Sequence, residues 1–155
     1  MKKTTPTRRD FMKIAGIATA GLTLNSSTPK VHAGENNTIK AALVGCGGRG
    51  GGAVMDVMKA GGPIQLHALA DVFEDKTAAY AKNFAAAFGE LGTVPKERQF
   101  TGFDAYKNAI DSLEPQKDLI LLATPPAFRP THVEYAVKKG VNVFMEKSFA
   151  TDAPG

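Results

Sequence analysis

One stretch of this 155-residue sequence decides the fold: Ile39-Lys40-Ala41-Ala42-Leu43-Val44-Gly45-Cys46-Gly47-Gly48-Arg49-Gly50. Its first half, residues 39–44, is short, largely apolar and bounded by a glycine, which is typical of a strand buried on both faces of a parallel sheet. Its second half has the spacing Gly-x-Gly-x-x-Gly, and a helix is predicted directly after it, over residues 49–59. In such a unit the three glycines allow a tight turn, the approach of a pyrophosphate to the backbone, and close packing of helix on strand.

An acidic residue stands where this fingerprint needs one. Residues 64–70 are predicted to form the second strand, and Asp71 follows it, 21 residues beyond Gly50. An acid at about this distance accepts hydrogen bonds from the ribose hydroxyls of the adenosine half of a dinucleotide. Val72 rather than an arginine comes next, which favours NAD over NADP, although Lys76 can reach the same place. The alternative is that Asp71 only caps the following turn or helix.

The rest of the chain alternates strands with helices. Residues 118–123 carry no polar side chain after the first, so this strand is predicted to be central. Strands joined by helices of about 10 to 15 residues form right-handed βαβ units. The predicted fold class is therefore α/β, a doubly wound parallel sheet of the Rossmann type. Its other elements are strands at residues 97–101 and 141–145, and helices at residues 75–88, 105–113 (with Asp104 as cap, and Tyr106 and Ile110 facing inward) and 130–139.

Residues 1–33 are predicted to be a targeting segment and not part of the fold. The run Thr7-Arg-Arg-Asp-Phe-Met-Lys13 resembles the twin-arginine (Tat) export motif, and an apolar run and the small residues of Val31-His-Ala33 follow it. The apolar run is shorter than the roughly 20 residues that span a bilayer, which argues against the alternative of a membrane anchor. We therefore expect export by the twin-arginine machinery to the periplasm or the cell exterior, with residues 34–37 as a linker and 38–155 as the nucleotide-binding domain.

The basic excess of the chain belongs to this segment. The chain has 19 Lys and Arg against 15 Asp and Glu, a net charge of +4, but residues 34–155 carry 13 basic and 14 acidic side chains. No nucleic-acid surface is therefore predicted, nor is a metal site. The lone cysteine, Cys46, has no disulfide partner and is interpreted as a small loop residue rather than a nucleophile.

Taken together, the motifs resemble those of one family, the Gfo/Idh/MocA oxidoreductases, relatives of glucose-fructose oxidoreductase and inositol dehydrogenase. The resemblance covers about residues 38–155, which match the N-terminal half of the family. It implies an NAD-dependent or NADP-dependent hydride transfer to or from a sugar-like or polyol-like substrate, and export by the twin-arginine route fits such substrates. The motifs are Gly-x-Gly-Gly-Arg-Gly (45–50), Ala-Asp-Val-Phe (70–73), Phe103-Asp-x-Tyr106, Ala123-Thr-Pro-Pro126 and Gly-Val-Asn-Val-Phe-Met-Glu-Lys (140–147).

The resemblance also implies roles for residues by position. Lys147 matches the lysine that lies beside the nicotinamide and contacts the substrate oxygen, where an ammonium stabilises developing charge. Glu146 is expected to line the nicotinamide end of the site, and Thr124 and Pro125 to pass under the cofactor ribose. The alternative for Lys147 is a solvated charge at a strand end.

Two residues depart from the family pattern. Ser148 replaces the proline that follows the lysine, so the backbone that aims Lys147 is less constrained. Arg129 stands where many members have a histidine, and His132 lies one turn further on. Both are candidate contacts to substrate or cofactor, with a helix-surface position as the alternative for His132.

The resemblance also implies a second, substrate-binding domain that this chain does not contain. We expect a truncated gene or partial sequence, and a chain that binds NAD weakly and turns over no substrate alone. Two other classes remain open. One is a non-catalytic nucleotide-binding remnant, and the less favoured one is an S-adenosylmethionine-dependent methyltransferase, whose sheet also has a glycine loop and an acid after its second strand.

Overall fold

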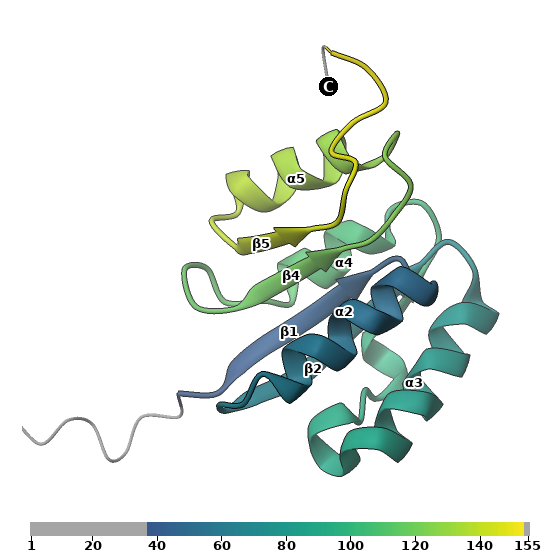
Figure 1. The fold of residues 1–155 in the computed structure, drawn as a ribbon, viewed down its shortest axis with the longest axis vertical. Coiled ribbons are helices and arrows are strands. Elements are labelled where there is room, and N and C mark those ends of the chain that lie inside the picture. The colour runs from purple at the N-terminus through teal and green to yellow at the C-terminus, as the bar shows by residue number, and fades with distance from the viewer. Residues whose placement is uncertain (1–36, 154–155) are drawn as a thin grey trace, which may run out of the picture. The chain divides into compact units, whose positions relative to one another are not determined.

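The computed structural model describes residues 37–153. The predicted targeting segment, and the predicted linker apart from its last residue, lie outside these residues. Residues 37–153 form a five-stranded parallel sheet with helices on both faces (Figure 1). The predicted doubly wound α/β fold is therefore confirmed.

The strand of the glycine fingerprint lies at the centre of the sheet. The strand order is β3-β2-β1-β4-β5, so β1 pairs with β2 on one side and with β4 on the other. The chain reverses its direction across the sheet between β1 and β4, and ligands of such sheets bind at this switch point, outside the carboxyl ends of the strands. The elements are β1 (Ile39–Val44), α2 (Gly48–Lys59), β2 (Ile64–Asp71), α3 (Glu74–Phe88), the 3-10 helices η1 (Gly89–Gly92) and η2 (Lys96–Arg98), β3 (Gln99–Thr101), α4 (Ala105–Asp111), β4 (Leu119–Leu122), α5 (Arg129–Lys138) and β5 (Asn142–Met145).

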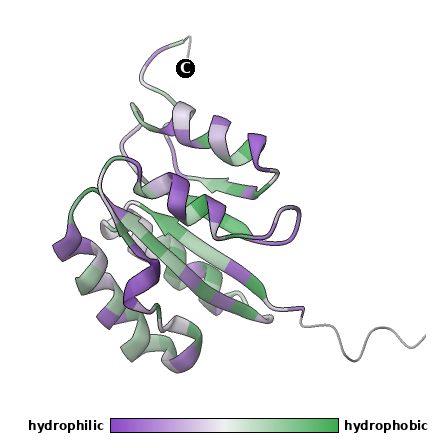
Figure 2. Ribbon diagram, turned by 180° about the vertical axis from the view of Figure 1, so that it is seen from behind, coloured by the Kyte–Doolittle hydropathy of each residue, from purple (hydrophilic) through white to green (hydrophobic). Residues whose placement is uncertain are grey.

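Two apolar layers cover the sheet. On one face α2 and α3 supply Val54 and Phe84, and on the other face α4 and α5 supply Ile110 and Ala136. Consecutive residues of β1 and β4 enter opposite layers, which explains why these strands are apolar at nearly every position. Figure 2 shows the hydrophobic colour along the central strands and more hydrophilic colour on the helices. The strand residues of the first layer include Leu43, Leu66, Leu69 and Leu121, and those of the second include Ala42, Val44, Ala68, Ala70, Ile120 and Leu122.

The bounds of most elements differ from the sequence expectations by one residue, and the differences around β3 and α4 are larger. The third strand begins at Gln99 because residues 96–98 form η2. The helix α4 ends at Asp111 rather than at residue 113. Asp104 occupies the N-cap position but its side chain caps no backbone N–H, because its carboxylate pairs with Lys107 at 2.8 Å instead.

Asp118 was predicted to be the first residue of the fourth strand, but β4 begins at Leu119 and Asp118 lies just before it. Its side chain is fully buried, and its carboxylate accepts hydrogen bonds from the backbone N–H groups of Lys40 (2.9 Å) and Glu114 (2.8 Å). A buried carboxylate needs such partners. Asp118 therefore links the loop before β4 to the start of β1, at the amino ends of the strands and away from their carboxyl ends.

Candidate functional site

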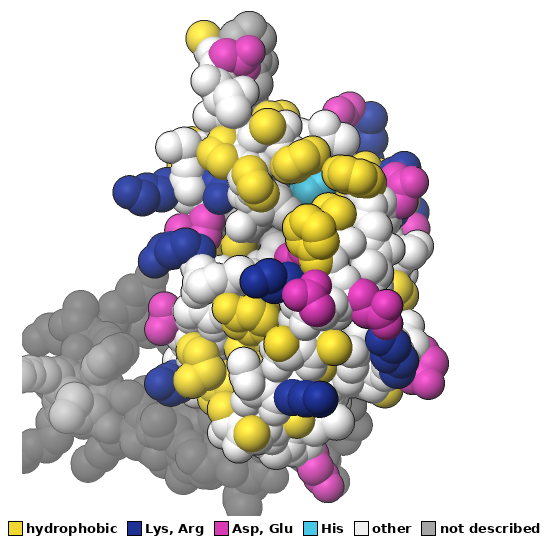
Figure 3. Space-filling model, turned by 90° about the vertical axis from the view of Figure 1, so that its right-hand side faces the viewer, with side chains coloured by type: hydrophobic (Ala, Val, Ile, Leu, Met, Phe, Trp, Pro, Cys, Tyr) yellow, Lys and Arg dark blue, Asp and Glu magenta, His cyan; other side chains and the backbone are white. Residues whose placement is uncertain are grey.

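A cavity of about 430 Å³ opens at the carboxyl ends of the strands. Its walls come from the ends of β1, β2 and β4 and from the starts of α3, α4 and α5, so it lies at the switch point of the sheet. Figure 3 looks onto this side of the domain and shows hydrophobic side chains gathered beside a histidine. The cavity is lined by Val44, Gly45, Cys46, Gly47, Asp71, Val72, Phe73, Lys76, Gly102, Phe103, Ala105, Tyr106, Ala123, Thr124, Pro125, Phe128 and His132.

The glycine loop has the geometry that the fingerprint requires. Gly45 has φ +99°, and a β-carbon there would lie 2.8 Å from the carbonyl carbon of Ala123. A β-carbon at Gly50 would lie 2.1 Å from the carbonyl oxygen of Gly45, so α2 can approach β1 only with glycine at this place. A β-carbon at Gly47 would meet nothing within 4 Å. The backbone is thus tightly packed at Gly45 and Gly50, whereas the space beside Gly47 is free, and this is the glycine of the fingerprint that a pyrophosphate approaches.

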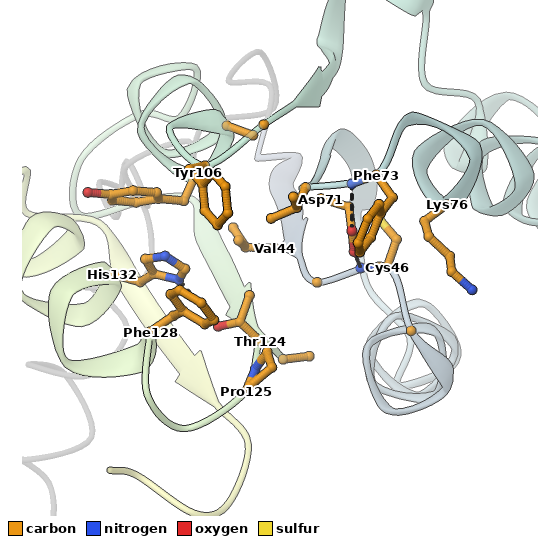
Figure 4. A pocket seen from close by; sticks show the side chains of 17 residues that line it. Val44, Cys46, Asp71, Phe73, Lys76, Tyr106, Thr124, Pro125, Phe128 and His132 are labelled. Atoms are coloured by element: carbon orange, nitrogen blue, oxygen red, sulfur yellow. Dashed lines mark hydrogen bonds between the residues drawn. The ribbon is translucent and has the colours of Figure 1, made fainter. Parts of the chain in front are cut away.

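Asp71 is tied directly to this loop. Its Oδ2 accepts a 2.7 Å hydrogen bond from the backbone N–H of Cys46, and its Oδ1 accepts one of 3.0 Å from the N–H of Phe73 (Figure 4). The bond to Phe73 is a local turn contact of the kind expected if Asp71 only capped the following turn. The bond to Cys46 is not explained by that alternative. The bond to Cys46 holds the carboxylate at the cavity wall, where both halves of the fingerprint meet.

An aromatic wall faces Asp71 across the cavity. The ring of His132 stacks on that of Tyr106 with centroids 4.1 Å apart, and its Nδ1 lies 3.3 Å from Oγ1 of Thr124. Figure 4 shows these side chains and Phe128 on the side opposite Asp71. Burial lowers the pKa of His132 to about 4, so the imidazole is neutral at pH 7. This wall therefore offers flat, uncharged surfaces.

Three of the aromatic side chains that border the cavity are exposed. Phe73, Phe103 and Phe128 keep 63%, 73% and 43% of their surface accessible. Large exposed aromatic groups around a cavity mark a surface that a flat ligand can cover. No role was predicted for these residues from the sequence. The available signal was the position of Phe73 and Phe103 within two of the family motifs, directly after β2 and β3.

Arg49 and Glu146 meet at the end of the sheet, outside the cavity lining. Nη2 of Arg49, at the start of α2, lies 2.5 Å from Oε1 of Glu146, which follows β5. The Arg49 side chain is 77% exposed and that of Glu146 only 10%. The hydrogen bond from Arg49 holds the pKa of Glu146 below its ordinary value. The ion pair therefore joins two predicted cofactor-binding residues that are far apart in the sequence.

Arg129 and Lys147 do not line the cavity either. Arg129 is only 5% exposed, and its guanidinium donates to backbone carbonyls of Thr124, Glu146 and Ser148. These backbone contacts were not expected from the sequence, and the expected contact of Arg129 with substrate or cofactor stays a prediction. Lys147 is exposed directly after β5, and its catalytic role stays a prediction.

The Cys46 side chain is buried against β2. Its Sγ lies 3.7 Å from the carbonyl oxygen of Ala70, and burial, followed by the charge of Asp71, raises the pKa of the thiol to about 12. A thiol that stays protonated is a poor nucleophile. Cys46 thus contributes its backbone N–H, not its sulfur, to the site.

Residues 37–153 hold no group of three or more His, Cys, Asp or Glu side chains placed to bind a metal ion. Within the same part of the chain, no helix has the length and the apolar character to cross a membrane.

No family model matches the chain, but several known proteins are similar to it in sequence and in fold. A glycosyl hydrolase family 109 protein from Solibacter usitatus (strain Ellin6076) is 29% identical over 147 residues, which cover 90% of this chain and 32% of that protein. The solved structure of myo-inositol 2-dehydrogenase from Lactobacillus plantarum is 26% identical with a TM-score of 0.54, and the match covers 74% of this chain and 30% of that one.

Two other solved structures contain a cofactor. The WlbA dehydrogenase from Chromobacterium violaceum, in complex with NADH and UDP-GlcNAcA, has a TM-score of 0.57 at 22% identity, over 75% of this chain and 29% of that one. The scyllo-inositol dehydrogenase from Lactobacillus casei, with bound NAD(H) and scyllo-inositol, has a TM-score of 0.53 at 22% identity, over 74% and 29%.

The fold and the glycine fingerprint therefore define the class of this chain as a Rossmann-type α/β domain. Its structural neighbours are NAD-binding dehydrogenases of the Gfo/Idh/MocA type, which confirms the resemblance that the motifs indicated. The chain spans about a third of the length of the curated relative and of these dehydrogenases, and it matches their N-terminal domain.

Proposed function

We propose that residues 37–153 are the NAD-binding domain of an oxidoreductase that transfers hydride to or from a sugar-like or polyol-like substrate. The observation that carries the proposal is the 2.7 Å hydrogen bond from the Cys46 N–H to the Asp71 carboxylate at the switch point of the sheet. It joins the phosphate-binding and ribose-binding parts of the fingerprint at one cavity. The NADH and NAD(H) in the structures of two neighbours support NAD as the cofactor.

The residues present fit a dinucleotide along the carboxyl edge. Asp71 accepts from the adenosine ribose, and the open backbone at Gly47 and the N-terminus of α2 receive the diphosphate, because free N–H groups and the helix dipole favour anions there. The exposed rings of Phe73 and Phe103 would cover the adenine. The nicotinamide supplies the hydride acceptor or donor. Lys147 would hold the substrate oxygen with its ammonium and would stabilise charge that develops there.

Asp71 also supports NAD over NADP. Its carboxylate repels a 2′-phosphate, and both of its oxygens already accept hydrogen bonds from backbone N–H groups, so the carboxylate cannot easily turn aside. Lys76 lines the same cavity and is the residue that can offset this repulsion. A ratio of NADH to NADPH affinity above one is therefore expected.

Export by the twin-arginine route remains part of the proposal and rests on the sequence alone, because residues 1–36 are outside the described part. This route carries folded cargo, so a protein of this kind can leave the cytoplasm with its nucleotide loaded. The test is replacement of Arg8 and Arg9 by lysine in the full chain. Retention of the unprocessed chain inside the cell is expected, and unchanged export contradicts the proposal.

Titration of the purified chain with NADH, followed by nicotinamide fluorescence, tests the cofactor assignment. Saturable binding is expected, and Asp71→Asn is expected to weaken it by about tenfold or more, since a charged acceptor to the ribose is lost. Asparagine is better than alanine here because its oxygen can still accept the Cys46 N–H. Glu97→Gln, an exposed acid in η2, is the matched control and should leave the affinity unchanged.

Two results of this titration contradict the proposal. One is Asp71→Asn with undiminished affinity for NADH. The other is binding of S-adenosylmethionine without binding of NADH, which identifies the methyltransferase alternative instead.

A further inference from the structure

We propose that Arg129 is a positioning residue that fixes the backbone on both sides of Lys147 against the segment that follows β4. The inference rests on the proposed function, because it concerns the end of the site to which the nicotinamide is assigned. It gives Arg129 no direct contact with cofactor or substrate.

The contacts of one guanidinium carry the argument. Arg129 is the first residue of α5 and is 5% exposed. Its Nε donates to the carbonyl oxygen of Thr124 at 2.7 Å, and its Nη1 donates to the carbonyl oxygens of Glu146 and Ser148, the latter at 2.5 Å. Three carbonyl groups from the ends of two neighbouring strands thus converge on one rigid, planar group.

The two bonds of Nη1 bracket Lys147. The carbonyl groups of residues 146 and 148 lie on either side of this lysine along the chain, so binding both to one nitrogen fixes how the backbone bends between them. Lys147, Ser148 and Phe149 are all exposed, so packing does little to hold this segment. Serine at position 148 also lacks the restricted φ of proline. Arg129 therefore supplies the constraint that the sequence around Lys147 does not.

The burial of the charge supports the same conclusion. Placing a guanidinium at 5% exposure costs free energy unless its donors are used. The neighbouring Glu146 carboxylate balances part of the charge, and it bonds to Arg49 rather than to Arg129. Nε and Nη1 of Arg129 thus donate to backbone carbonyl groups and not to a carboxylate. A lysine keeps the charge, but its single ammonium cannot span both segments as the guanidinium fork does.

One consequence separates this role from a general contribution to stability. Arg129 joins the ends of β4 and β5, whereas Asp71 ends β2 and Phe73 follows it, on the other side of β1. Loss of Arg129 should therefore disturb the nicotinamide end of the site and leave the adenosine end intact. Adenosine monophosphate reports on the adenosine end alone, because it has the ribose and one phosphate but no nicotinamide.

The experiment compares the affinities of the full chain for NADH and for adenosine monophosphate in Arg129→Lys and Arg129→Gln. We expect NADH to bind about tenfold more weakly, since hydrogen bonds from a charged group are lost, and the affinity for adenosine monophosphate to stay the same. Lys138→Gln is the matched control, because it removes an exposed cation from the same helix, and it should alter neither affinity.

Unchanged NADH affinity in both Arg129 variants overturns the inference, and so does an equal loss of both affinities, which indicates a general structural effect. Failure of the unaltered chain to bind either ligand refutes the proposed function instead. The role of Arg129 is then decided without ligand, by amide hydrogen exchange of residues 147–150 in Arg129→Lys. Faster exchange supports the inference, and unchanged exchange overturns it.

A measurement on the unaltered chain covers the case in which both variants fail to fold. Rotation about the Cζ–Nη bonds of arginine can be followed by NMR, and it should be much slower in Arg129 than in free arginine in the same buffer. Rotation in Arg129 as fast as in free arginine means that its carbonyl contacts do not persist, and the inference is then wrong.

Discussion

The backbone N–H of Cys46 lies 2.7 Å from Oδ2 of Asp71, and this bond joins the loop after β1 to the end of β2. A second bond, from the N–H of Gly45 to the carbonyl oxygen of Ala70 at 2.8 Å, runs beside it. Together they orient the Asp71 carboxylate before any ligand arrives. A group that is already oriented loses less conformational freedom on binding, which raises affinity.

The first prediction concerns two glycines of the same loop. Gly50→Ala should lower the free energy of unfolding by about 1–3 kcal/mol, because its β-carbon would lie 2.1 Å from the Gly45 carbonyl oxygen and α2 would have to move away from β1. Gly47→Ala should leave stability nearly unchanged, because its β-carbon meets nothing within 4 Å, but it should weaken NADH binding by filling the space of the diphosphate. Urea unfolding and NADH titration separate the two effects. Equal losses of stability in both variants would contradict this assignment of roles.

The second prediction concerns the Arg49–Glu146 ion pair. Because the Arg49 side chain is 77% exposed, Arg49→Gln should change the melting temperature little. It should weaken NADH binding, because a positive charge at the start of α2, where the diphosphate is proposed to bind, is lost and the charge of Glu146 is no longer balanced. Glu146→Gln should have the opposite effect, since Arg49 becomes available to the phosphates, and the affinity should then fall more steeply with salt. Weaker NADH binding in Glu146→Gln would show that Glu146 contributes in another way.

The third prediction is a pH dependence of stability. The pKa of His132 is about 4 in the folded chain and about 6.5 when unfolded, so the unfolded chain binds more protons between these values. The stability that His132 contributes is therefore complete above about pH 6.5 and is lost as the pH falls towards 4, by up to about 3 kcal/mol, less where water in the cavity screens the charge. The measurement is urea unfolding between pH 4 and pH 8.

His132→Phe is the control for this pH dependence. It keeps a flat ring against Tyr106 and removes the titrating group, so its stability should depend less steeply on pH between 4 and 6.5. His67, whose pKa burial also lowers, contributes in the same direction in both chains and cancels in the comparison. Identical pH profiles of the two chains would assign the dependence to other groups.

The fourth prediction concerns the thiol. Cys46 should react with an aromatic disulfide reagent far more slowly in the native chain than in urea, because its sulfur is buried and its pKa is raised to about 12. Cys46→Ala should bind NADH almost as well as the unaltered chain, since the N–H that Asp71 accepts belongs to the backbone. Rapid labelling of the folded chain, or loss of binding in Cys46→Ala, would mean that the sulfur itself takes part.

Much of the site could be predicted from the sequence because a βαβ unit has a nearly fixed length. The glycine spacing placed the turn after β1, and the distance of Asp71 from Gly50 placed the acid at the end of β2, where the structure finds it. The aromatic wall was not foreseen. Tyr106 was expected to face inward as part of the core, and only the parallel pairing of β1 with β4 brings α4 and α5 together so that His132 stacks on it.

The order of the elements, the place of β4 between two other strands and the positions of the fingerprint residues could thus be predicted, because they follow from local apolar runs, glycines and spacing. The contacts of the polar side chains became visible only in the folded domain. Arg49 pairs with Glu146, which is 97 residues away in the sequence. Arg129 donates hydrogen bonds to carbonyl groups after two neighbouring strands. Such contacts depend on which strand ends are neighbours in the sheet, and a local pattern of residues does not indicate the order of the strands.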